Sequence, residues 1–259
     1  MADDAGVLAL LAAAVARNAD VEPLAARLCR ACLEVLGADG GSITLLPASA
    51  GQLTVCTSDV TSARFEDLQD VLGEGPTRMA HTEGRVVVAA VDGESFVDVV
   101  LDGDGDGHHL TGEDSPFPMF LELAPEVAAP VTVFAFPMRP GGNAIGVLTC
   151  HAASGELAIS LHDCLRLADA VGAALLGDRE SLSATAPGWR ERAKIHQATG
   201  MVIAQLGLPA EDALALLRAH AYAGGVTLDE VAERVVARQL SFATQAPGST
   251  PTIEEEEES

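Results

Sequence analysis

Aromatic and basic residues are scarce in this chain. Phe, Trp and Tyr together make up 3% of 259 residues, although 48% of the residues are apolar. A hydrophobic core can therefore form, and Ala, Leu and Val must supply most of it. Lysine and arginine number 15 against 38 acidic residues, which gives a net charge of −23. This charge disfavours nucleic-acid binding by the chain as a whole, because phosphate contacts depend on cations.

Long apolar runs are also missing. No stretch of about 18 residues is free of charged and polar side chains, so we predict no transmembrane helix and no membrane partner. The N-terminus, MADDAGVLALL, is acidic before its apolar part, whereas a secretory signal begins with basic residues. We therefore expect the protein in the cytoplasm.

The 5 cysteines are odd in number and scattered, which argues against a disulfide scaffold. Cys29 and Cys32 form a CxxC, but they fall inside a helical pattern without a second pair, whereas structural zinc needs four ligands. We expect both to be small buried residues. No Ser-His-Asp, Walker or metal-hydrolase spacing is present, so the sequence predicts no enzyme.

Patterns along residues 1–182 predict helices before and after an antiparallel sheet, which is an α+β fold. Asp20 is placed to cap the second helix and Gly37 to end it. The predicted elements are helices at 5–18 and 21–36, a hairpin at 42–47 and 52–58, a helix at 63–72, a turn at GEGP 73–76 with a new helix beyond it, a strand at 85–91, an irregular stretch at 92–118, a short helix at 118–126, a hairpin at 129–139 and 143–152, and a long helix at 160–182.

Residues 184–188, ATAPG, break this pattern, and the chain then reads as helix to residue 242. A tail at 243–259 is rich in Pro, Ser, Thr and Glu, and we expect it to be disordered and solubilising. The helical segment 189–242 contains six basic and six acidic residues, so the negative charge lies elsewhere. Its local charge therefore permits RNA binding.

The first helix of this segment, about 189–206, has an unusual polar face. Its buried stripe is Ile195, Ala198, Val202 and Leu206, and its opposite face carries Arg190, Lys194, Gln197, Gly200, Met201 and Ala204. A glycine inside a helix costs about 1 kcal/mol relative to alanine. Close approach of a partner would explain Gly200, and either RNA or another protein helix fits.

The next two helices have clear boundaries. The second begins with Pro209 in its first turn and stops at the Gly-Gly pair 224–225, and the third opens with a capping box from Thr227 to Glu230. Tyr222, the only tyrosine, lies in the last turn of the second helix. There it either stacks on a base or belongs to the core.

Two segments, RAKIHQATGMVIAQLG and ALALLRAHAYAGGVTLDEVAERVV, closely resemble the ANTAR domain over about residues 190–242. The resemblance implies a three-helix RNA-binding module that controls transcription termination in bacteria, with paired stem-loops read by a dimer. Many members carry lysine just before the first-helix glycine, where this chain has Thr199.

The resemblance also implies an RNA site within 189–242. Its cations would neutralise phosphates, its small and polar residues would allow close approach and hydrogen bonding, and its tyrosine would stack on a base. The candidate residues are Arg190, Arg192, Lys194, Gln197, Thr199, Gly200, Arg218 and Tyr222. Sequence-specific DNA binding is not expected.

The order of elements over about 5–182, with GEGP and the hairpin FAFPMRPGGNAIGVLTCH, resembles the GAF sensor domain that is found fused to ANTAR modules. The resemblance implies a small-molecule ligand in a pocket beside the sheet, or dimerisation, and it names no ligand. Cys150 and His151 match the Cys-His pair of bilin-binding relatives in type, but they lie in a predicted strand rather than a helix. We therefore expect no chromophore attachment.

The long helix at 160–182 has apolar residues at roughly heptad spacing. It is a natural dimer seam between sensor and effector, or it packs on its own sheet, and both can hold at once. These residues are Leu161, Cys164, Leu165, Ala168, Val171, Leu175 and Leu182.

One further motif is DGDGDGHHLTGE at 102–113, which fits the calcium-loop pattern D-x-D-x-D-G-x5-E. The ligands would be Asp102, Asp104, Asp106, the carbonyl of His108, and Glu113. No helix is predicted before the motif, and prolines deny the helix after it. A calcium site and a flexible acidic insertion therefore both remain open.

These observations predict a GAF-like sensor at 5–182, a three-helix RNA-binding domain at 189–242 and an acidic tail. The expected function is antitermination by a dimer on stem-loops in nascent RNA. The alternative is a sensory or protein-interaction module whose helical domain does not bind RNA.

Overall fold

The structure is a computed structural model that describes residues 4–20, 23–46, 52–91, 96–100, 108–111, 115–178 and 187–242. For 4–5, 96–100, 108–111 and 187–191 it describes the backbone alone. All statements below concern these residues.

A seven-stranded antiparallel sheet forms the centre of the larger domain. Its strands lie in the order β2-β1-β7-β6-β3-β4-β5, so that strands distant in sequence, β1 and β7, are neighbours. Close approach in this pair requires glycine, because a Cβ on Gly41 would lie 2.4 Å from the carbonyl oxygen of Thr149. The strands are β1 (Gly40–Leu45), β2 (Leu53–Thr57), β3 (Val86–Val91), β4 (Phe96–Val100), β5 (His108–Thr111), β6 (Val131–Met138) and β7 (Gly146–Ala152).

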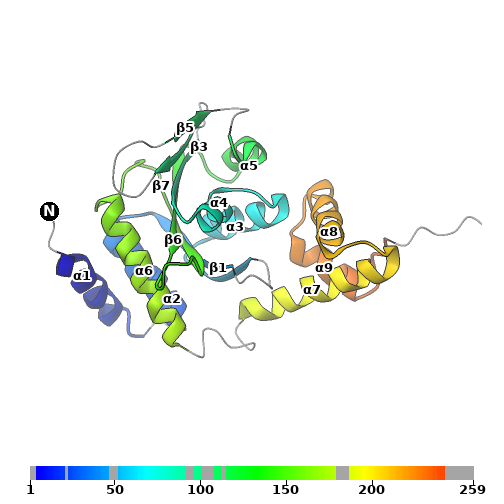
Figure 1. The fold of residues 1–259 in the computed structure, drawn as a ribbon, viewed down its shortest axis with the longest axis horizontal. Coiled ribbons are helices and arrows are strands. Elements are labelled where there is room, and N and C mark those ends of the chain that lie inside the picture. The colour runs from blue at the N-terminus through cyan, green and yellow to red at the C-terminus, as the bar shows by residue number, and fades with distance from the viewer. Residues whose placement is uncertain are drawn as a thin grey trace, which may run out of the picture.

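Helices cover both faces of the sheet (Figure 1). On one face lie α1 (Asp4–Arg17), α2 (Leu24–Leu36) and α6 (Leu161–Gly177). On the other lie α3 (Val60–Leu72), α4 (Pro76–Glu83) and α5 (Pro118–Leu123), which the 3-10 turn η2 (Ala124–Glu126) continues. Beyond them lie α7 (Pro187–Leu206), α8 (Ala210–Gly224) and α9 (Leu228–Val236). The predicted α+β class and the C-terminal helices are confirmed.

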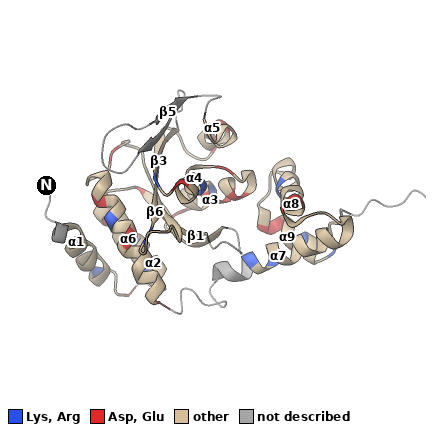
Figure 2. Cartoon of the chain, viewed as in Figure 1, with Lys and Arg blue, Asp and Glu red and all other residues tan. Residues whose placement is uncertain are grey.

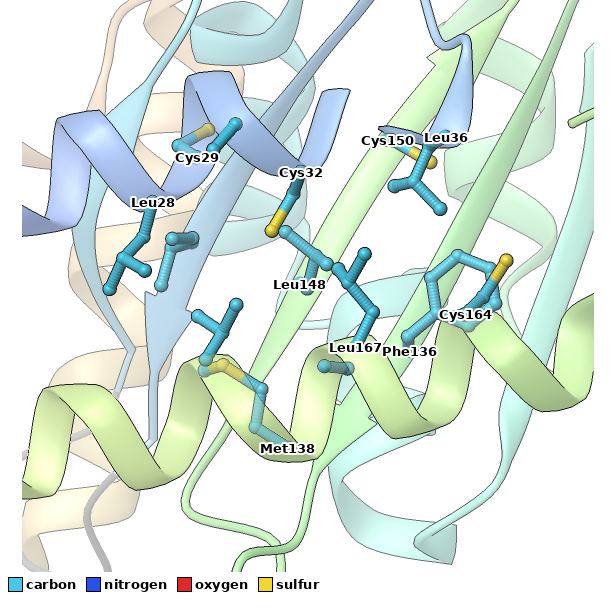
Figure 3. Close-up of a cluster of buried hydrophobic side chains, with 14 of the residues drawn as sticks. Leu28, Cys29, Cys32, Leu36, Phe136, Met138, Leu148, Cys150, Cys164 and Leu167 are labelled. Atoms are coloured by element: carbon cyan, nitrogen blue, oxygen red, sulfur yellow. The ribbon is translucent and has the colours of Figure 1, made fainter. Parts of the chain in front are cut away.

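The two faces of the sheet have separate apolar cores, because successive residues of a strand point to opposite sides. On β7, Leu148 and Cys150 belong to the core under α1, α2 and α6, whereas Val147 belongs to the core under α3, α4 and α5. Figure 3 shows the first core, into which Cys29 and Cys32 point from α2. Both cysteines are buried free thiols among apolar side chains, as the sequence indicated.

The same core changes the interpretation of α6. Five of its heptad residues are buried against the protein's own sheet and helices: Cys164, Leu165, Ala168, Val171 and Leu175. The predicted stripe is therefore used inside one chain. The helix ends at Gly177, with Asp178 as its C-cap, whereas the sequence predicted a helix to residue 182. Asp178, the last described residue of this segment, is already outside the helix.

Other sequence predictions need correction. The stretch 92–118, expected to be irregular, contains β4 and β5, which extend the sheet at its edge. Asp20 does not cap α2, since Pro23 is the N-cap and makes no side-chain cap. The last helix ends at Val236 rather than running to 242, and Arg238 there adopts a left-handed φ of 59°.

The calcium-loop motif falls mostly outside the described residues. Asp102, Asp104, Asp106 and Glu113 are not described, and His108 begins strand β5, where its partner is Val99. The element before the motif is strand β4 rather than a helix.

In the described part of the chain, no single helix is long and apolar enough to cross a membrane. Residues 192–206 and 210–224 meet that test only as a pair, across a bend of 108°.

Candidate nucleic-acid interface

Three helices, α7, α8 and α9, enclose a small core of their own. The local sequence sets their limits. Gly225 ends α8 in a left-handed conformation with φ 60°. The Thr227 side chain accepts a hydrogen bond from the Glu230 amide while the Glu230 carboxylate accepts one from the Thr227 amide, so the predicted capping box is present. The core residues are Ile195, Ala198, Val202, Ala213, Leu217, Ala221, Leu228, Val231, Ala232 and Val235.

The outer face of α7 is open where the sequence suggested close approach. Gln197 and Gly200 are exposed, and a Cβ added at Gly200 would meet no atom within 4 Å. The Thr199 hydroxyl donates to the carbonyl of Ile195 at 2.8 Å, so it is turned back onto its own helix. Met201, expected on the exposed face, is half-buried against the three-helix core instead.

The predicted phosphate-binding cations whose side chains the structure describes are all engaged in ion pairs. Lys194 forms an ion pair with Glu233 of α9, and both side chains are partly exposed. Arg190 lies in α7, but its side chain is outside the described atoms. Figure 2 shows basic and acidic residues mixed over these helices rather than a single basic patch.

Arg192 and Arg218 are directed at the larger domain. Nη1 of Arg192 lies 3.2 Å from Oδ2 of Asp70, and the Arg192 side chain is only 4% exposed. Nε of Arg218 donates to the Asp70 carbonyl at 2.9 Å, and its Nη2 lies 3.6 Å from Oδ1 of the same residue. Burial lowers the pKa of Arg218, and the nearby Asp70 carboxylate opposes that shift. Both arginines are therefore held against α3.

Asp70, which contacts both arginines, is the residue of this candidate site that sequence reasoning missed. It lies in α3, far from the arginines along the chain, and no local pattern marks it. The neighbouring Val71 packs against the three-helix core, which was also not foreseen. Only the fold brings α3 against α8 and α9.

Tyr222 is about half exposed and lines a groove between the two domains. The groove has a volume of about 660 Å³ and is bounded by α3 and η2 on one side and by the turn between α8 and α9 on the other. Its charged lining is mostly acidic, with Asp67, Glu126 and Glu230 against Arg64. The tyrosine thus stands at the domain junction rather than on the outer face of α7.

The larger domain contains a buried polar cluster centred on Glu66 of α3. Its carboxylate accepts hydrogen bonds from the hydroxyl of Ser42 at 2.7 Å, the amide of Gln52 at 2.8 Å and the hydroxyl of Thr77 at 3.2 Å. Burial raises the pKa of Glu66 to about 7, although the hydrogen bonds from the Ser42 and Thr77 hydroxyls act in the opposite direction. The cluster joins β1, α3 and α4 on the sheet face that α3, α4 and α5 cover.

Sequence comparison assigns the smaller domain. The family described as the ANTAR domain matches residues 189–236, a segment that contains α8, α9 and all but the first two residues of α7. This segment is an ANTAR domain. The predicted resemblance is confirmed for these residues. No curated protein matches the chain by sequence.

Solved structures resemble the larger part of the chain only distantly. A phycoerythrobilin-bound GAF domain from a cyanobacterial phytochrome has a TM-score of 0.44 at 14% identity, covering 68% of this chain and 95% of that one. The chromophore-binding domain of Stigmatella aurantiaca bacteriophytochrome has 0.37 at 15%, covering 66% and 60%. The photosensory core module of Stigmatella aurantiaca phytochrome has 0.42 at 14%, covering 82% and 45%. This chain thus spans about half to three fifths of the Stigmatella structures, and such low values support no statement about its ligand.

The GAF-like description therefore depends on the chain's own elements. Two hairpins, one on either side of the helices α3 and α4 in sequence, meet in one antiparallel sheet with helices on both faces. The Cys150 side chain, considered above for chromophore attachment, lies in the core under α2 and α6, on the opposite face from α3 and α4.

Proposed function

We propose that this protein is an RNA-binding regulator of transcription termination, with a GAF-like domain at about 5–182 that senses a small molecule and an ANTAR domain at about 189–242 that binds stem-loops in nascent RNA in the cytoplasm. The observation that carries the proposal is the ANTAR match together with the open face of α7 at Gly200. Calcium plays no part in this proposal.

The proposed RNA surface contains Gln197 and Gly200, with Arg190 and Lys194 on the same face of α7. An exposed glycine lets a phosphodiester backbone approach the helix closely, and the amide of Gln197 can hydrogen-bond a base or a phosphate. Lys194 reaches phosphate only by exchanging its Glu233 partner, which is a small cost for an exposed ion pair.

A dimer is part of the proposal, but its interface differs from the apolar stripe of α6 that the sequence suggested. Exposed leucines lie on two neighbouring helices, Leu8 and Leu10 on α1 and Leu176 on α6. We name these three residues the leucine patch. Since the apolar stripe of α6 is already buried in the chain's own core, we infer that a second copy would instead contact exposed leucines of α1 and α6.

The test compares three variants with the parent chain in a gel-shift assay, using a two-stem-loop leader RNA at low salt. Gly200→Glu adds a bulky anion to the open face and should weaken binding by at least about a hundredfold, because the carboxylate meets phosphate. Gly200→Ala keeps the face small and neutral and should bind as the parent does. Ala215→Glu, at an exposed position of α8, is the charge-matched control and should lose much less.

All three variants should remain folded, because position 200 has free space around it and Ala215 is exposed. Equal binding by Gly200→Glu and Ala215→Glu would show that the α7 face does not contact RNA. Failure of every form to bind structured RNA would favour the alternative, a protein-interaction module, for which the engaged arginines provide the specific support.

A further inference from the structure

One carboxylate forms ion pairs with two arginines across the junction of the two domains. Asp70 belongs to α3 of the GAF-like domain, and Arg192 and Arg218 come from different helices of the ANTAR domain. The two guanidinium groups approach the two carboxylate oxygens separately, at 3.2 Å from Oδ2 and 3.6 Å from Oδ1. The site is thus a clamp of two arginines around one anion.

A third arginine lies near this clamp. Arg78 of α4 lies close enough that Arg192 lowers its pKa, in addition to the larger effect of burial, while Asp70 raises it. Three guanidinium groups therefore interact electrostatically with the Asp70 carboxylate, and the carboxyl groups of Asp67 and Glu66, which also feel Asp70, lie on its own helix α3. If the Asp70 carboxylate moves away, Arg192 and Arg218 can therefore bind another anion in its place.

The geometry matches the chemistry of RNA. A carboxylate presents two oxygens and one negative charge, and a phosphodiester presents two non-bridging oxygens and one negative charge. Arginine recognises both groups through the same fork of N–H donors. Both arginines are also among the residues that the ANTAR resemblance assigns to phosphate contacts.

We propose that Asp70 acts as an internal phosphate mimic that keeps the ANTAR domain closed, so that the GAF-like domain and RNA compete for Arg192 and Arg218. This inference rests on the RNA-binding function proposed above and adds its regulation. A signal received by the GAF-like domain would act by withdrawing α3 from the arginines.

The rest of the junction is compatible with opening. The apolar contact across it includes Val71, and the groove of about 660 Å³ lies directly beside it between α3 and the α8–α9 turn. Junctions of this polar, incompletely filled kind permit relative motion of domains. A ligand or an RNA that binds only the open state shifts the population by its difference in affinity for the two states.

The test uses the full chain and the same two-stem-loop RNA. Asp70→Asn keeps the size of the side chain and removes its charge, and it should raise RNA affinity by about tenfold, the scale of a typical coupling between two sites. Asp67→Asn is the matched control, since it removes the same charge one turn earlier on α3 and lines the groove. It should change affinity by less than about twofold. Asp70→Ser is a second variant and should show the same gain as Asp70→Asn.

The outcomes separate this proposal from the function on which it rests. Parent affinity in both Asp70 variants, with RNA still bound, overturns the phosphate mimic and leaves the RNA-binding function intact. An equal gain in Asp67→Asn also overturns it, because net charge alone would then explain the gain. If no form binds structured RNA, the proposed function fails and the competition fails with it.

Discussion

The buried carboxyl of Glu66 should make the stability of this protein depend on pH in an unusual direction. Its folded pKa of about 7 exceeds the ordinary value of 4.5, so the folded state holds a proton that the unfolded state releases. The stabilising effect of that proton is complete below the unfolded pKa and is lost as the pH rises through the folded pKa. The free energy of unfolding should therefore fall between about pH 4.5 and pH 7 at this site.

The magnitude follows from the shift. A pKa displacement of this size corresponds to a loss on the order of 3 kcal/mol in the free energy of unfolding, completed slightly above pH 7. Glu66→Gln removes the titration and keeps the size of the side chain. The hydroxyls of Ser42 and Thr77 can rotate to serve the new amide, and the Gln52 amide can turn to present its oxygen, which has no hydrogen bond in this structure.

Urea unfolding of the parent and Glu66→Gln at several pH values between about 5 and 8 measures the effect. The difference between their free energies of unfolding should change by roughly 2 kcal/mol over that range, in favour of the glutamine variant at high pH. Glu126→Gln, at an exposed position of η2, is the control and should follow the parent. Parallel profiles for the parent and Glu66→Gln would refute the reasoning.

Two other predictions concern the ANTAR domain and the dimer. Thr227→Ala removes the side-chain oxygen that accepts from the Glu230 amide, and it should lower the free energy of unfolding by about 1 kcal/mol in urea titrations; an unchanged value would mean that the end of α9 is held by other contacts. Leu10→Glu places a charge in the leucine patch and should weaken self-association by at least about tenfold in sedimentation equilibrium, because a carboxylate is costly to bury at an apolar interface. Val60→Glu, which charges an exposed apolar residue outside the patch, should leave association unchanged, and an equal loss in both variants would place the seam elsewhere.

Local signals in the sequence predicted the parts of the fold that depend on local energetics. The capping box at Thr227 and the stops at Gly37 and Gly225 are set by residues within one turn, and all three are where the sequence placed them. Alternating apolar residues likewise located the two hairpins of the central sheet. Strands β4 and β5 were missed because both are short and the sequence between them is rich in Gly and Asp, which is typical of irregular structure.

The site depended more on tertiary contacts and was predicted less well. Gly200 and Gln197 are exposed as the helical period required, because their position depends only on the face of α7. Arg192 and Arg218 were predicted to contact phosphates, yet both are engaged by a residue more than a hundred positions away. Helical periodicity cannot reveal such a contact, since it depends on how α3 docks.

The central claim is RNA binding through the ANTAR domain, and the most direct measurement is the salt dependence of that binding for the full chain and Asp70→Asn. If Arg190, Arg192, Lys194 and Arg218 neutralise four phosphates, affinity for a two-stem-loop RNA should fall roughly a hundredfold between about 50 mM and 200 mM salt. Asp70→Asn should bind more tightly than the parent throughout. Absence of binding in both proteins at the lowest salt, or an affinity that does not change with salt, would contradict the account.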